Sequence, residues 1–86
     1  MSVGEVKASL RAAIEAARQG RRVFDQAASE AEASTRTAVA ILQGSQNEDV
    51  TAVHEALNAA AAEVEPTRRR FDNAANHASA YLTRLG

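Results

Sequence analysis

The chain has 86 residues, so we expect a single small domain over residues 1–86. Hydrophobic residues make up 45% of the chain, but 21 of them are alanine, and tryptophan and cysteine are absent. These values exclude a large apolar core, disulfide bonds and thiolate metal sites. The net charge of −1 provides no overall attraction to nucleic acid or anionic lipid.

The first predicted element is a helix over about residues 3–43. Ser2 followed by Glu5 fits a capping box, which marks a helix start. Apolar and small residues then recur every seven residues in two registers that lie three residues apart. These registers are Val3, Leu10, Ala17, Phe24, Ala31 and Ala38, and Val6, Ala13, Gly20, Ala27, Ser34 and Ile41, with Ile14, Ala28 and Leu42 widening the stripe. Such spacing is typical of a helix in a bundle or coiled coil.

A turn is predicted over about residues 44–48. Gly44 can end the first helix in the left-handed conformation, and the polar residues after it offer Ser45 or Asn47 as the next N-cap. A connection this short makes the flanking helices antiparallel neighbours.

The second predicted helix covers about residues 49–84. Its registers are Val50, Leu57, Val64, Phe71, Ala78 and Leu85, and Val53, Ala60, Thr67, Ala74 and Tyr81, with Ala61, Ala75 and Leu82 widening the stripe. Pro66 lacks a backbone N–H and clashes with the preceding turn, so we expect a kink near it. The alternative is that Pro66 begins a separate helix, with Glu65 near its start.

An internal repeat relates the two helices. The segment RRVFDQAA at 21–28 returns 47 residues later as RRRFDNAA at 68–75, and the match extends outward on both sides. One structural unit is therefore used twice. Folding back at the turn brings Phe24 opposite Phe71, near a pseudo-twofold axis. The predicted fold class is all-α, an antiparallel two-helix hairpin, and its thin core predicts pairing with a second copy into a four-helix bundle.

Two groups of residues are candidate functional sites. The interaction stripe, in the core or at a dimer interface, comprises Val3, Val6, Leu10, Phe24, Ile41, Val53, Leu57, Phe71, Tyr81 and Leu85. A mid-hairpin arginine belt, a candidate anion site, comprises Arg21, Arg22, Arg68, Arg69 and Arg70. Carboxylates interleave with this belt at i,i+4 spacing, in the pairs Arg21–Asp25, Arg68–Asp72 and Glu65–Arg69. We therefore interpret the arginines mainly as a solvated, ion-paired face.

No arrangement typical of an enzyme stands out. His54 and His77 lie 23 residues apart on one helix, and the serines and threonines lack a nucleophile-and-base pattern. We expect no enzymatic activity and no cofactor. No segment is apolar enough to span a membrane, and no signal-peptide core begins the chain, so the expected location is the cytoplasm, with signal-independent secretion as the alternative.

The layout resembles an uncharacterised family of short, Ala-rich helical-hairpin proteins from actinobacteria. Leu42-Gln43-Gly44-Ser45 at the turn, Asp49-Val50 at the start of the second helix and Ala80-Tyr81-Leu82 near the end carry this resemblance. The outline is also similar to the WXG-type substrates of type VII secretion, which are dimerising helical hairpins. Here Leu42-Gln43-Gly44 stands in place of Trp-x-Gly, and Leu85 stands where their export signal has an acidic residue.

These features lead to one functional hypothesis and two alternatives. The hypothesis is a non-enzymatic interaction or structural module that pairs helices, either as a homodimer or as an adaptor for another helical protein. The first alternative is a phosphate or nucleic-acid binder that uses the arginine belt. The sequence does not favour it, because no aromatic residues accompany the belt for base stacking. The second alternative is a WXG-like secreted hairpin.

Overall fold

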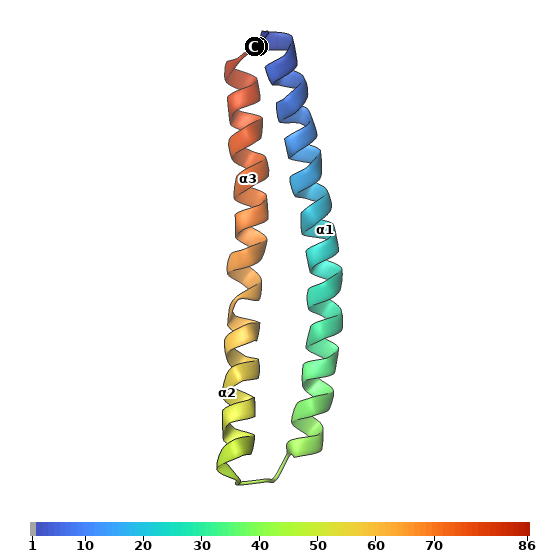
Figure 1. The fold of residues 1–86 in the computed structure, drawn as a ribbon, viewed down its shortest axis with the longest axis vertical. Coiled ribbons are helices and arrows are strands. Elements are labelled where there is room, and N and C mark those ends of the chain that lie inside the picture. The colour runs from blue at the N-terminus through green and yellow to red at the C-terminus, as the bar shows by residue number, and fades with distance from the viewer. Residues whose placement is uncertain (1) are drawn as a thin grey trace.

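The protein is an antiparallel helical hairpin (Figure 1). A computed structural model describes residues 2–86 and contains three helices: α1 (Val3–Leu42), α2 (Glu48–Ala62) and α3 (Val64–Arg84). The helices α2 and α3 follow one another along a single rod beside α1. All elements of residues 2–86 are helices, so the expected all-α hairpin is confirmed, and it measures 63 × 17 × 17 Å.

The helix ends follow the local chemistry of the sequence. The backbone N–H of Glu5 donates to Ser2 Oγ at 3.1 Å, which caps α1. After α1, Gly44 adopts a φ of 88°, the left-handed conformation expected of it. The backbone N–H of Asp49 then donates to Asn47 Oδ1 at 2.7 Å. Asn47, rather than Ser45, is thus the N-cap of α2, and the second rod begins at Glu48.

The second rod is interrupted at one residue. Glu63 separates α2 from α3, and its φ and ψ of −84° and −11° remain in the right-handed helical region. Pro66 explains the position, because it has no N–H to donate to the carbonyl of residue 62 and its ring crowds that carbonyl. The ladder resumes one residue later, where Thr67 N donates to the Glu63 carbonyl at 3.1 Å. Despite this interruption, α3 continues in nearly the same direction as α2 (Figure 1).

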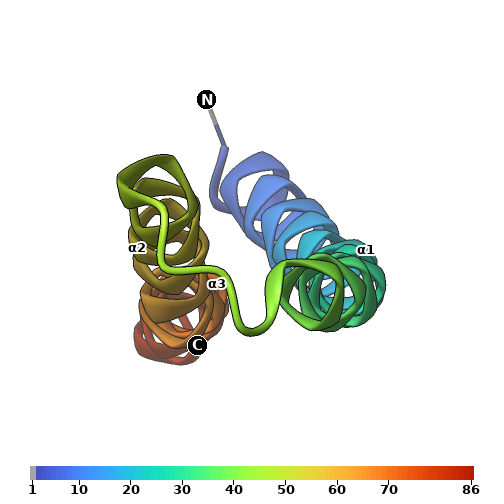
Figure 2. The same ribbon diagram turned by 90° about the horizontal axis from the view of Figure 1, so that it is seen from below.

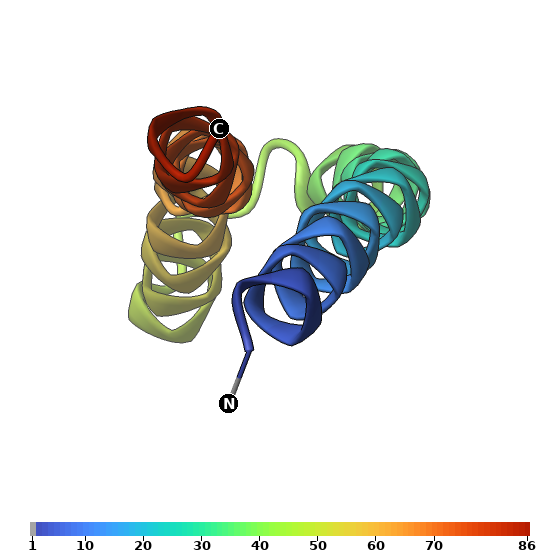
Figure 3. The same ribbon diagram turned by 90° about the horizontal axis from the view of Figure 1, so that it is seen from above.

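The core is thin, as the alanine content predicts. Within residues 2–86 the buried hydrophobic residues are Ile14 and Ala75, which are 8% and 9% exposed. The helix α1 packs mainly against α3 and much less against α2. Viewed along their length, the two rods are inclined to one another and joined by the short loop (Figures 2 and 3). At the open end, Lys7 Nζ of α1 donates to the backbone oxygen of Gly86 at 2.8 Å.

The seam between the rods corrects one part of the sequence interpretation. The register that contains Phe24 and the register that contains Phe71 do face the opposite rod. Their partner register is offset by four residues rather than by the three that we expected. The half-buried or buried seam partners are Lys7, Ile14, Arg21, Ala28, Thr35 and Leu42 on α1, and His54, Arg68, Ala75 and Leu82 on α2 and α3. The residues expected there lie mostly exposed beside the seam.

Candidate functional site

Two phenylalanine rings meet halfway along the hairpin. The ring centroids of Phe24 and Phe71 are 5.9 Å apart with an interplanar angle of 39°, within the range of favourable aromatic pairs. Both residues are half-buried. The Phe71 ring also lies on Gly20, since a Cβ built there would be 2.7 Å from Phe71 Cε1. Only glycine admits the ring so close, and the predicted contact between the two copies of the repeat is confirmed.

Two ion pairs cross the hairpin beside the rings. Arg68 Nε donates to Asp25 Oδ1 at 2.7 Å, and Arg21 Nη1 donates to the carboxylate of Asp72. In the repeat, Arg21 is equivalent to Arg68, and Asp25 is equivalent to Asp72. Each arginine therefore bonds the aspartate of the other copy, and the two crossed pairs are equivalent to one another. An approximate twofold axis therefore passes between the rods at the phenylalanine pair. Sequence analysis missed these crossed pairs, although the repeated Arg-x-x-Phe-Asp pattern was the signal for them.

The crossed pairs form one network. Arg21 Nε also donates to Asp25 Oδ2 at 3.0 Å, so Asp25 receives bonds from both rods. Hydrogen bonding from Arg68, reinforced by Arg21, holds the pKa of Asp25 below its usual 3.8. The pKa of the Arg68 guanidinium is raised by Asp25, and that of Arg21 is raised by Asp72. Because the network needs both rods in one alignment, it fixes the register of the hairpin.

The arginine belt is largely paired with acidic side chains. Arg21 and Arg68 belong to the network above, whereas Arg22 Nη2 lies 3.2 Å from Glu15 and Arg70 Nη1 lies 3.7 Å from Glu63. Arg68 bonds Asp25 of the other rod rather than the expected Asp72. For Arg69, the described chain offers no carboxylate within 4.0 Å, so the expected Glu65–Arg69 pair is absent there; Glu65 instead pairs with Arg68 at 3.4 Å.

The two registers that we expected in the seam, offset by three residues from those of Phe24 and Phe71, form a surface beside it that we call the uncharged face. It comprises Val6, Ala13, Gly20, Ala27, Ser34 and Ile41 on α1, and Val53, Ala60, Thr67, Ala74 and Tyr81 on the second rod. Two antiparallel rods lie in one plane, and the twofold axis that exchanges them is perpendicular to that plane. Rotation about this axis keeps each residue on the same side of the plane. The repeat relates Val6 to Val53 and Ala27 to Ala74. Both halves of the uncharged face therefore lie on the same side.

The opposite side of the seam differs sharply in charge. This side is formed by the register that lies four residues after the seam partners on each helix. Its residues are Gly4, Arg11, Arg18, Asp25, Glu32 and Val39 on α1, and Thr51, Asn58, Glu65, Asp72, Ser79 and Gly86 on the second rod. Six of these twelve positions are charged, whereas none of the eleven positions of the uncharged face is. The ion-pair network belongs to the charged side and the contact between Gly20 and Phe71 to the uncharged one. The two sides of the seam therefore differ in their charged residues.

Several residues of the predicted interaction stripe belong to no intramolecular core. Val3, Ile41, Val53 and Tyr81 are 56%, 77%, 42% and 42% exposed. The others, Val6, Leu10, Phe24, Leu57, Phe71 and Leu85, are half-buried. The guanidinium carbon of Arg84 lies 5.6 Å from the centre of the Tyr81 ring, a cation–π distance. Large apolar side chains thus remain exposed near both ends of the uncharged face.

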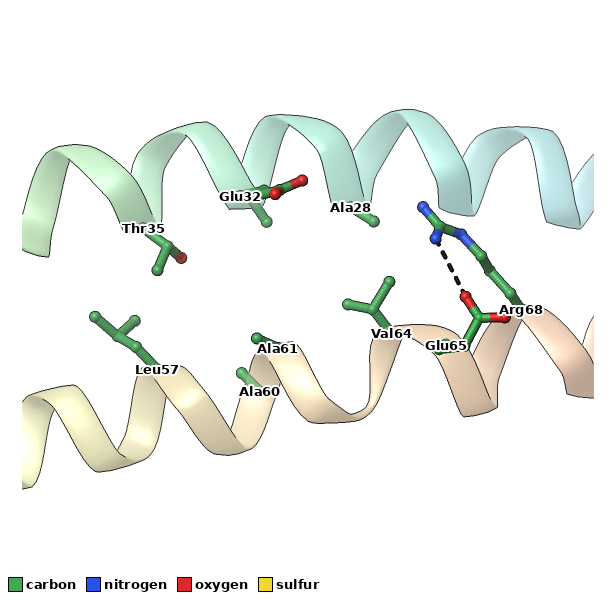
Figure 4. A pocket seen from close by; sticks show the side chains of 10 residues that line it. Ala28, Glu32, Thr35, Leu57, Ala60, Ala61, Val64, Glu65 and Arg68 are labelled. Carbon is green, nitrogen blue, oxygen red and sulfur yellow. Dashed lines mark hydrogen bonds and ion pairs between the residues drawn. The ribbon is translucent and has the colours of Figure 1, made fainter.

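A groove of about 370 Å³ separates the rods between the phenylalanine pair and the loop (Figure 4). It is lined by Ala28, Ala31, Glu32, Thr35, Leu57, Ala60, Ala61, Val64, Glu65 and Arg68. The repeat explains it: Ala61 and Thr35 stand where the other half of the hairpin has Ile14 and Leu82. The groove is therefore a place where the duplicated core has lost bulk.

Two features are absent from residues 2–86 of the structure, a metal-binding cluster and a membrane-spanning helix. Among these residues no group of three His, Cys, Asp or Glu side chains is placed to hold a metal ion. None of the three helices, over the described part of the chain, is long and apolar enough to cross a membrane.

Comparison with known proteins identifies no relative. No protein-family model, no curated protein and no solved structure matches the chain.

Proposed function

We propose that this protein is a non-enzymatic interaction module whose helices pair with helices of another polypeptide. The observation that carries the proposal is the excess of exposed surface. The hairpin exposes 6291 Å², whereas a compact monomer of 9.1 kDa exposes about 4,900 Å². Its radius of gyration is 19.4 Å, against about 12 Å for a compact domain of this length. A rod with so small a core gains stability from a partner.

The uncharged face supports the same proposal. Helix-in-groove recognition uses an apolar stripe on one helix face, and a stripe without charged residues avoids the desolvation cost of burying ions. The mid-hairpin arginines do not favour phosphate binding as strongly, because Arg21 and Arg68 already bond Asp72 and Asp25. The conclusion is a helix-pairing module with the uncharged face as its contact surface.

Site-specific photo-crosslinking in the producing cell tests this function. A photoreactive residue at position 27, on the uncharged face, should give a discrete adduct with a polypeptide. The matched control is position 33, another exposed alanine on the outer side of α1, which should give none. Absence of an adduct from position 27, or equal labelling from both positions, contradicts the proposal.

A further inference from the structure

We infer that the partner on the uncharged face is a second copy of this chain, so that two hairpins form a four-helix bundle. This inference rests on the proposed function and assigns its partner. It is carried by the symmetry of the uncharged face, by its lack of charge and by the area that the hairpin leaves exposed.

The symmetry of the face suits a self-complementary contact. In a twofold dimer the same patch is used by both chains. The uncharged face is already its own approximate image, because Val6, Ala13 and Ala27 are repeated as Val53, Ala60 and Ala74 on the neighbouring rod. A second hairpin laid on this face would place four near-equivalent helices around one core, which is the arrangement of a four-helix bundle.

The side chains allow close contact at the middle of the face. Gly20, Ala27 and Ala74 are small, and small residues let helices approach to the short end of the usual 8–10 Å. The Phe71 ring lies against Gly20, so this ring borders the face. Larger side chains at the two ends, such as Ile41 and Tyr81, are exposed in the single hairpin.

The exposed area of the whole hairpin is more than enough for a dimer interface. The surplus over a compact monomer is about 1,400 Å² per chain, and a standard stable interface buries about 800 Å² per partner. The net charge of −1 per chain causes little repulsion between copies. Because half of the positions on the opposite side are charged, that side would face water in the bundle.

Sedimentation equilibrium of the purified full chain tests the inference. The wild type should sediment as two chains of 9.1 kDa each. The double variant Ala27→Glu with Ala74→Glu places carboxylates on the face in both repeats, and its dissociation constant should rise at least ~100-fold, because burying unpaired charge is costly. The control is Ala33→Glu with Ala80→Glu, the same change at related exposed positions on the outer sides of α1 and α3. This control should remain a dimer.

Charge rescue separates loss of contact from loss of folding. Mixing the Glu double variant with Ala27→Lys, Ala74→Lys chains should restore a two-chain species, since opposite charges then meet across the interface. A wild type that sediments as one chain at ~100 µM overturns the inference, as does equal dissociation of face and control variants, or a mixture that stays dissociated. If the purified chain sediments as a monomer, but the chain in the cell forms a crosslink to a different protein, the second copy is excluded and the interaction function stands. If crosslinking also fails, both are wrong.

Discussion

Refilling the groove between the rods should stabilise the protein. The change is Ala61→Ile, which restores at position 61 the residue that the repeat has at Ile14. In the half of the hairpin near the termini Ile14 is 8% exposed, whereas Ala61 is exposed at the edge of the groove. The groove measures about 370 Å³, and apolar cavities of about 150 Å³ already hold benzene, so three further carbons fit.

The expected magnitude follows from the carbons added. Each buried CH₂ contributes about 0.8 kcal/mol, so three contribute about 2.4 kcal/mol. Ordering the isoleucine side chain costs about 0.5–1 kcal/mol, and its lower helix propensity costs a few tenths more. The free energy of unfolding should therefore rise by about 1 kcal/mol, which corresponds to roughly 4–8 °C in the melting temperature of a domain this size.

The assay is denaturant unfolding followed by circular dichroism at one fixed protein concentration. The matched control is Ala33→Ile, at an exposed position outside the seam, which should lose a few tenths of a kcal/mol. The converse change, Ile14→Ala, should cost about 2–5 kcal/mol. If Ala61→Ile is no more stable than Ala33→Ile, the groove is not a gap in the duplicated core.

Three further predictions concern the rings, the ion pairs and the turn. Gly20→Ala should destabilise the hairpin, because overpacking against the Phe71 ring costs about 1–3 kcal/mol, whereas the better helix propensity of alanine contributes only about 1 kcal/mol. In a Phe71→Leu background, Gly20→Ala should instead stabilise the hairpin. If unfolding measurements show that the effects of the two changes simply add, Gly20 and Phe71 are not in contact. The lowered pKa of Asp25 means that its bond from Arg68 stabilises the fold above pH 3.8 and is lost as the pH falls through the lowered pKa. Thermal melting of Asp25→Asn should therefore vary less than wild type between about pH 2 and pH 5, and an unchanged profile would disprove this. Gly44→Ala should lower the free energy of unfolding by about 1 kcal/mol, since φ is 88° there; no loss would mean that the turn differs.

Most of the architecture was predictable from local chemistry. Ser2 and Gly44 bound the first helix as expected, and the 47-residue repeat placed Phe24 against Phe71. The bend falls at Glu63, three residues before Pro66, because the missing N–H and the ring act on the turn that precedes the proline. These features depend on contacts within one turn or on exact repetition, both of which a single sequence contains.

The choice of seam was not predictable from hydrophobicity alone. In an alanine-rich chain the register through Ala13 and Ala27 is as apolar as the register through Ile14 and Ala28, so the pattern does not discriminate between offsets of three and four. The true seam also contains Arg21, a residue that a hydrophobic criterion rejects. Arg21 lies in the seam because it bonds Asp72 of the other rod. That bond depends on how the two copies align, which neither helix determines alone.

An isotope-filtered nuclear Overhauser experiment detects the proposed contact between two hairpins. Labelled and unlabelled chains are mixed, and only contacts between different chains are recorded. A bundle joined through the uncharged face should give signals from the methyl groups of Ala27 and Ala74 to the partner chain and none from Ala33 or Ala80. Signals confined to single chains, or arising equally from the two pairs of alanines, would contradict a bundle of two hairpins joined through the uncharged face.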